Sequence, residues 1–265
     1  MNLQKIIVAL IFTFLSTILL AHEFWLEPQK FVIKIGEKIN LRLFVGEDYH
    51  GEAVDFSKFK VEKFTHYTAN GERNMSGSFT ENQLSDFLDF DVEGNHLIAF
   101  NNSNKFIELE SEKFNKYLIG EGLEHILEIR KQQNQLASKG RELYQRCAKT
   151  LLQVGKKHSD TYKKNTGMRL ELIPEQNPYE TKNTKLGFQV LFDNLPLKNA
   201  LVLVWHKDRK NRTTHRKYRS DDNGKVIFQF VKKDRYMVST VQMIAHTDRN
   251  QADWESYWGS YTFGF

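Results

Sequence analysis

The fold is decided by the stretch LGFQVLFDNLPLKNALVLVW, residues 186–205, in which two apolar runs flank a turn-like segment. Strand-length apolar runs bounded by Asp, Asn and Pro are typical of β-strands joined by a turn. The chain continues with SDDNGKVIFQF, residues 220–230, where Asn-Gly marks a second turn before alternating apolar residues. A further apolar run covers residues 236–244. We therefore predict a β-sandwich domain over residues 165–265.

The order of these elements is similar to that of a known class of sandwich. A strand is followed by the pattern DxxPLxxA at residues 193–200, a second strand, DDNGK at 221–225, a third strand and RYMV at 235–238. This order resembles the carboxypeptidase regulatory-like and Cna B-type immunoglobulin-like sandwiches. The resemblance implies an immunoglobulin-like fold for residues 165–265, although a fold by itself does not assign a function.

Strand-like alternation also marks the first part of the chain. Apolar residues recur at every second position in three short runs that are separated by turn residues. The runs are Phe31, Ile33 and Ile35, then Ile39, Leu41, Leu43 and Val45, and finally Ile98 and Phe100 after His96. We predict a first β-sandwich over residues 22–107, so that the chain is mainly β with two immunoglobulin-like sandwich domains.

The segment between the two sandwiches has the period of a helix. Apolar residues are spaced three and four apart in two sets, and Gly155 marks a C-terminal stop. The sets are Phe114, Tyr117, Leu118, Leu123, Ile126 and Leu127, followed by Leu143, Cys147, Leu151 and Val154. We predict a helical insertion of two or three helices over residues 108–164.

The first 21 residues have the order of a secretory signal peptide. Lys5 precedes an apolar stretch from Ile6 to Leu20, and Ala21 offers the small residue needed before the cleavage site. The stretch is shorter than the ~20 apolar residues of a spanning helix. Leu19 occupies a position where a small residue is usual, so a retained anchor is the alternative. Cleavage would remove residues 1–21. The mature protein would then begin at His22 and would not span the membrane.

The cysteine count indicates the compartment of the protein, and its charge limits which partners it can have. Cys147 is the only cysteine, so no intramolecular disulfide can form, which suits a bacterial periplasm better than an animal secretory route. The 38 Lys and Arg exceed the 33 Asp and Glu, and part of the excess lies in residues 207–217. Such a run can contact nucleic acid or anionic lipid, but an exported protein rarely meets nucleic acid. We expect a solvated hairpin tip and no nucleic-acid partner.

Three further segments point to a family. They read HEFWLEP at residues 22–28, FIELESEKFNKYL at 106–118 with YQRCAKTLL at 144–152, and DWESYWGSYTF at 253–263. Together they resemble the NikM-like family of exported proteins, many of which are described only as a domain of unknown function. The resemblance implies a periplasmic metal-binding accessory protein for nickel or cobalt uptake. A TonB-dependent receptor or a metal permease would then be its partner.

The start of the mature protein has chelating chemistry. Cleavage after Ala21 would place a free α-amine on His22, and the amine and the imidazole together can chelate nickel, cobalt or copper. The alternative is an N-terminal residue that only forms hydrogen bonds where a strand begins. One residue is not a complete site, and His246, His206 and His66 are the candidates to complete it. Their spacing in the sequence does not select among them, and each is also compatible with a surface or hydrogen-bonded role.

Two tryptophans in the C-terminal motif allow a second function. Trp254 and Trp258 are four residues apart, with Tyr257 between them. They could form a sugar- or ligand-stacking surface, or they could close the bottom of the core, and packing is the favoured interpretation. The stacking surface is the basis of the rival function, a non-catalytic carbohydrate- or protein-binding module of the cell envelope.

The sequence carries no signature of a common enzyme class. It lacks the GxSxG, HExxH, P-loop and dinucleotide-binding motifs. An N-terminal His with a second His can hold copper, as in oxidative polysaccharide-cleaving enzymes, but the helical insertion and the missing flanking pattern argue against that class. We expect a protein that is not an enzyme.

Overall fold

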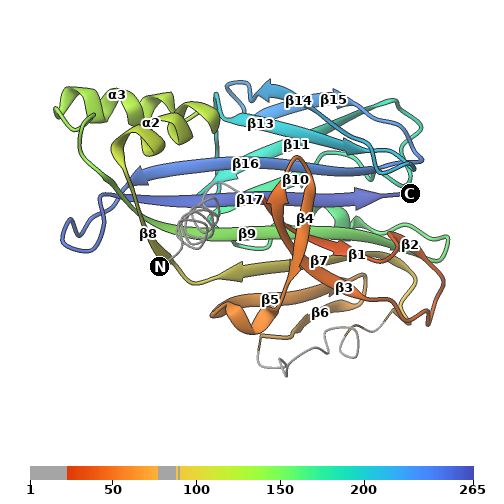
Figure 1. Ribbon diagram of the computed structural model, residues 1–265. Coiled ribbons are helices and arrows are strands. Elements are labelled where there is room, and N and C mark those ends of the chain that lie inside the picture. The colour runs from red at the N-terminus through yellow and green to blue at the C-terminus, as the bar shows by residue number, and fades with distance from the viewer. Residues whose placement is uncertain (1–22, 77–87, 89) are drawn as a thin grey trace, which may run out of the picture.

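The computed structural model describes residues 23–76, 88 and 90–265 (Figure 1). The predicted signal peptide, residues 1–21, and the candidate ligand His22 lie outside the described residues. The described chain is mainly β, as the alternating sequence pattern predicts, and it contains two α-helices and three sheets.

A ten-stranded sheet runs through the middle of the molecule. Its main order is β14-β13-β16-β17-β9-β7-β5-β6, and the short strands β2 and β8 also pair with β9. The strands are β2 (Val32–Ile33), β5 (Val61–Thr68), β6 (Gly71–Asn74), β7 (Gly94–Asn102), β8 (Lys105–Leu109), β9 (Gly140–Val154), β13 (Leu201–Lys207), β14 (Thr213–Arg219), β16 (Arg235–Ala245) and β17 (Trp254–Gly264).

Two smaller sheets and a helical pair complete the fold (Figure 1). The three-stranded sheet has the order β1-β3-β4, and in the four-stranded sheet β11 pairs with β10, β12 and β15. Their elements are β1 (Glu23–Pro28), β3 (Leu41–Glu47), β4 (His50–Val54), β10 (Leu170–Pro174), β11 (Lys185–Phe192), β12 (Leu195–Pro196), β15 (Lys225–Gln229), α2 (Ser111–Gly120) and α3 (Glu124–Gln132), with short 3-10 turns at Phe56–Lys58 and Asp160–Lys163.

The alternation of β17 explains how these layers stack. Tyr261 and Phe263 face the four-stranded sheet, where the ring centroid of Phe188 on β11 lies 5.3 Å from that of Tyr261. Trp254 and Trp258 point to the opposite face, toward α2 and α3. Because successive side chains of a strand alternate between faces, one strand supplies both cores. Tyr257 shares the face of Tyr261 and Phe263 and belongs to the same apolar core.

The prediction of a helix that contains Leu143, Cys147, Leu151 and Val154 is wrong. Leu143, Cys147, Leu151 and Val154 lie on β9, a fifteen-residue strand between β7 and β17. This strand is covered on both faces, so Leu151 and Leu152 are both fully buried although they point in opposite directions. A strand that is apolar on both faces has no clean period of two, and spacings of three and four arise by chance. The first part of the predicted insertion does form helices, α2 and α3.

The large sheet takes strands from both predicted sandwiches. β9 pairs in parallel with β17 from the C-terminal region and antiparallel with β7 from the N-terminal region. Strands on either side of the 108–164 segment therefore share one continuous sheet, with the helical pair packed on one of its faces.

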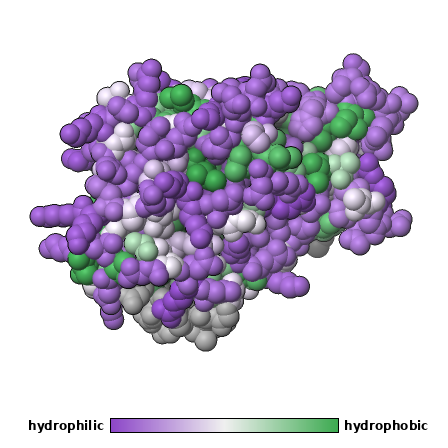
Figure 2. All heavy atoms as spheres, turned by 180° about the vertical axis from the view of Figure 1, so that it is seen from behind, coloured by the Kyte–Doolittle hydropathy of each residue, from purple (hydrophilic) through white to green (hydrophobic). Residues whose placement is uncertain are grey.

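The surface of the molecule is mostly hydrophilic. Figure 2 shows the face behind the view of Figure 1, where hydrophobic residues form a band across the upper half among hydrophilic ones. The most exposed large hydrophobic side chain is Leu195 on β12, followed by Ile227 on β15 and Ile119 on α2. Among the residues that the structure describes, no helix is both long and apolar enough to cross a membrane.

Candidate functional site

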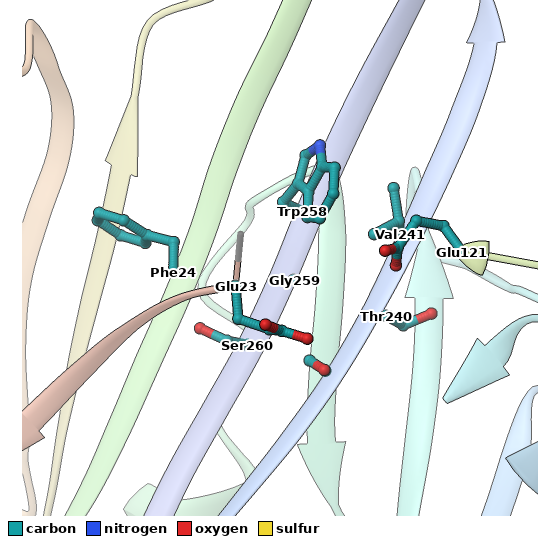
Figure 3. Close-up of a pocket in the computed structure, with 9 residues that line it drawn as sticks. Glu23, Phe24, Glu121, Thr240, Val241, Trp258, Gly259 and Ser260 are labelled. Atoms are coloured by element: carbon teal, nitrogen blue, oxygen red, sulfur yellow. The ribbon is translucent and has the colours of Figure 1, made fainter. Parts of the chain in front are cut away.

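A small pocket lies in the seam between the helical pair and the three-stranded sheet (Figure 3). Glu23 at the start of β1 and Glu121 just after α2 are directed toward the same gap above β16 and β17. Ser239–Val241 of β16 and Trp258–Ser260 of β17 form its floor. The cavity volume is about 10 Å³, which is the space of about one water molecule or one small ion. We call this cavity the ion pocket.

Glu23 reaches the ion pocket because its neighbour anchors β1. Phe24 is buried, with its ring centroid 5.3 Å from that of Phe100 on β7, and Glu23 pairs with Gly46 of β3. Burial raises the pKa of the Glu23 carboxyl to about 7, helped by the negative charges of Asp48 and Glu47 and opposed by a backbone hydrogen bond and by Arg146. At neutral pH this carboxyl is therefore only partly ionised.

Glu121 enters the pocket from the opposite side. It follows the last residue of α2, and its backbone N–H donates to the carbonyl oxygen of Tyr117, 3.0 Å away. Burial, together with the negative charges of Glu23 and Glu142, raises the pKa of its carboxyl to about 8, against the opposing charge of Lys217. Two carboxyls that disfavour each other's ionisation are a poor arrangement for an empty protein. A bound cation would attract both carboxylates and so lower the pKa of each.

A hydrogen-bonded group of side chains, Tyr117, Glu142, Ser256 and Trp258, holds the indole of Trp258 at the edge of the pocket, and we call this group the wall. Its Nε1 donates to Ser256 Oγ at 3.1 Å, and the Ser256 hydroxyl donates in turn to Glu142 on β9. Tyr117 of α2 also donates to Glu142, at 3.2 Å, and its ring stacks on Trp258 with centroids 5.7 Å apart. Burial raises the pKa of Glu142 to about 7 against the effect of these donors and of Arg146. The wall fixes the position of α2, and hence of Glu121, over the sheet.

The two candidate tryptophans have different surroundings. Trp254 is fully buried beneath the helical pair, and the guanidinium of Arg249 lies 5.6 Å from its ring centroid. That position suits the packing interpretation and leaves no face of the ring for a ligand. Trp258 is only partly buried and lines the ion pocket. The two side chains therefore share a face of β17 but not a role.

The structure does not bring His246, His206 and His66 together. His206 pairs with Tyr236 at one end of β16, and His246 follows the other end of that strand, roughly 33 Å away at the rise of a β-strand. His66 lies on β5, four strands across the sheet from β16. Within the described ranges, no group of three or more His, Cys, Asp or Glu side chains is arranged to hold a metal ion.

Each of these histidines has its own polar neighbour. His206 Nε2 is 2.8 Å from Asp234 Oδ2, and His246 Nδ1 is 3.5 Å from Glu255 Oε2. His66 is buried, with Nε2 2.8 Å from Nδ1 of His96. The ion pocket instead uses Glu23 and Glu121, which the sequence did not single out. Glu23 had a usable signal, because it stands in the HEFWLEP motif, whereas Glu121 stands between two glycines and had none.

Comparison with known proteins gives a family but no activity. Residues 19–244 match a family model described as a domain of unknown function, DUF4198. The chain belongs to the DUF4198 family. The match includes Glu23, Glu121 and residues 239–241 of the ion pocket, while Trp258 lies beyond it. The DUF4198 chain has no match among curated proteins.

One solved structure shows how remote the structural likeness is. It is described as the crystal structure of a tetra-tandem repeat in the extending region of a large adhesion protein. The match is 8% identical with a TM-score of 0.20 and covers 92% of this chain, which spans about half (49%) of that chain. A likeness this weak supports no argument about the DUF4198 chain.

Proposed function

We propose that this protein binds a transition-metal ion, nickel or cobalt with copper as a further possibility, in the ion pocket. It would act in the periplasm as a metal-binding accessory to uptake, with a TonB-dependent receptor or a metal permease as its partner. The observation that carries the proposal is the place of the pocket. Glu23, one of its two carboxyls, directly follows the residue that signal cleavage would make the N-terminus.

Glu23 of the pocket is covalently joined to the residue that would carry the N-terminal donors. Consecutive Cα atoms are ~3.8 Å apart, so an α-amine and an imidazole on His22 would start within one residue of Glu23. Two nitrogens from His22 and oxygens from Glu23 and Glu121 would make a mixed N/O donor set. Carboxylates alone favour magnesium or calcium, whereas adding an amine and an imidazole shifts the preference to nickel, cobalt and copper.

The size of the pocket supports an ion over a larger ligand. A cavity of about 10 Å³ has no room for a sugar or a peptide side chain. The carboxyl pKa values support the same conclusion, because the energetic cost of ionising Glu23 and Glu121 falls when a cation lies between them. The proposal assigns no reaction to the protein.

Proton competition follows from the same pKa values. A carboxyl must lose its proton to bind a metal, and the pKa values are about 7 for Glu23 and about 8 for Glu121. Affinity is therefore expected to rise with pH and to level off above about pH 8. Below that, each competing proton weakens binding by up to about tenfold per pH unit.

The test uses the mature protein with His22 as its first residue. Calorimetric titration with Ni²⁺, Co²⁺ and Cu²⁺ at pH 7.5 is expected to show one site with a dissociation constant below 1 µM. Glu121→Gln and a single glycine added ahead of His22 are each expected to weaken binding at least about tenfold, because each removes a donor. Glu128→Gln on α3 is the matched control, since its carboxylate is exposed and does not line the pocket. Absence of binding below micromolar concentration, or equal loss in the control, would contradict the proposal.

A second candidate function is a non-catalytic carbohydrate- or protein-binding module. The feature that favours it is a separate groove beside β14, which is far larger than the ion pocket. This function would not require metal, so the two candidates are separable by experiment.

A further inference from the structure

A groove between β14 and β15 is another hollow among the residues that the structure describes. Its volume is about 490 Å³, within the usual range for sites that hold an organic ligand or several side chains. Val204, Phe230 and Tyr236 form a buried apolar floor, and Arg216 and Tyr218 of β14 form one wall. The groove is independent of the ion pocket and shares no lining residue with it.

The groove exists because the chain changes sheets at one turn. β14 belongs to the large sheet and β15 to the four-stranded sheet, and residues 220–224 connect them. Asp221 Oδ1 accepts from the backbone N–H of Asn223 at 2.9 Å and of Lys225 at 2.8 Å, while Gly224 adopts a φ of 72°. The turn therefore separates two consecutive strands instead of pairing them.

Both strands beside the groove are sheet edges. Within the part of the chain that the structure describes, β14 pairs only with β13, and β15 pairs only with β11. An edge strand presents a row of backbone N–H and C=O groups that another extended chain can pair with. The seven residues of β14 are roughly 23 Å long at the rise of a strand.

The charge of this edge is strongly positive. Residues 207–219 contain seven Lys and Arg against a single acid, Asp208. Asp208 already pairs with Arg212, and Arg219 with Glu124, whereas Arg216 is exposed and has no ion pair with any described residue. None of the described residues that line the groove is acidic, and His206 at its floor is the partner of Asp234.

We propose that β14 is a docking edge for an extended acidic peptide segment of a partner protein. The segment adds to β14 as a further strand, so that its backbone supplies the hydrogen bonds and alternate side chains enter the groove. Opposite charges across a strand pair stabilise it and like charges destabilise it. A second copy of β14 is therefore a poor occupant, and an acidic strand is a good one. This docking goes beyond the proposed metal binding and does not depend on it.

The probe for this proposal is a synthetic nine-residue peptide of alternating Glu and Val. We expect it to shift the backbone amide resonances of Thr213–Arg219 in the ¹⁵N-labelled protein and to slow their hydrogen exchange. Arg216→Glu is expected to weaken binding about tenfold, because a favourable cross-strand charge pair becomes a repulsive one. Lys113→Glu on the exposed side of α2 changes the net charge equally and is expected to leave affinity within about twofold. Arg216→Gln, a milder change, provides a second variant with an intermediate effect.

Three results would overturn the proposal. The first is equal binding of a Lys-Val peptide of the same length. The second is binding of the acidic peptide without slower amide exchange in β14, because a strand addition must protect those amides. The third is binding of an anionic polysaccharide, tested with polygalacturonate, at concentrations where the acidic peptide does not bind.

Discussion

Replacing Glu121 by Gln is expected to stabilise the metal-free protein at alkaline pH while weakening metal binding at least about tenfold. Burial, together with the negative charge of Glu23, raises the pKa of Glu121 from 4.5 to about 8. A group whose folded pKa is raised contributes stability below its unfolded pKa, and that contribution is lost as the pH rises through the folded value. The folded protein must therefore bear the cost of a buried charge above about pH 8, and a neutral glutamine removes that cost.

The magnitude follows from the size of the shift. A change from 4.5 to about 8 corresponds to ~5 kcal/mol if Glu121 were fully buried and isolated. The side chain is only partly buried, so solvent screening reduces the gain, and we expect about 2 kcal/mol at pH 9. For a protein of this size that is a rise in Tm of roughly 4–8 °C. Near pH 5 the carboxyl is protonated in the folded state, and the difference is expected to be close to zero.

The assay is urea unfolding of wild type and Glu121→Gln at pH 5 and pH 9, each without metal. Glu128→Gln is the control, because its exposed carboxylate should give no pH-dependent difference. A variant that is no more stable than wild type at pH 9, or equally stabilised at both pH values, would refute the argument that the ion pocket holds a buried charge.

Three other substitutions or treatments test the surroundings of the site. Trp258→Ala is expected to lower the free energy of unfolding in urea by about 3 kcal/mol, because it removes the stack on Tyr117 and the hydrogen bond to Ser256. A decrease below about 1 kcal/mol would contradict a role of these contacts in holding α2 on the sheet. Lys149→Met is expected to lower the free energy of unfolding by about 3–5 kcal/mol, because it leaves the fully buried Glu171 carboxylate without its counter-charge. An unchanged free energy of unfolding in the same assay would show that the ion pair is dispensable. The Cys147 thiol is buried, and burial raises its pKa to about 12. A thiol reagent at pH 8 should therefore label Cys147 only as fast as the protein unfolds. Rapid labelling of the native protein would contradict the burial of this thiol.

The sequence predicted those parts of the fold in which one face of a strand is buried. Residues 201–205 and 225–229 alternate or run apolar between strong turns, and both form strands where expected. β9 was mistaken for a helix because both of its faces are buried, so the spacing of its apolar residues carried no strand period. The strand conformation of β9 depends on its pairing with β7 and β17, which come from distant parts of the sequence.

The candidate site was predictable only in part. The position of His22 follows from the signal-peptide pattern, and Glu23 stands beside it in the same motif. Glu121 is brought to Glu23 by the docking of α2 on β17 through Tyr117 and Trp258, a contact between segments far apart in the chain. The three other candidate histidines share a residue type but no position in the fold, so only the three-dimensional arrangement separates them from the pocket.

Anomalous diffraction can show whether nickel binds in the ion pocket. Crystals of the mature protein that begins at His22, grown with one equivalent of Ni²⁺, are measured at the nickel absorption edge. We expect a single anomalous peak within bonding distance of the Glu23 and Glu121 carboxylates. A peak at His206 or His246, or no peak with the ion pocket intact, would contradict it.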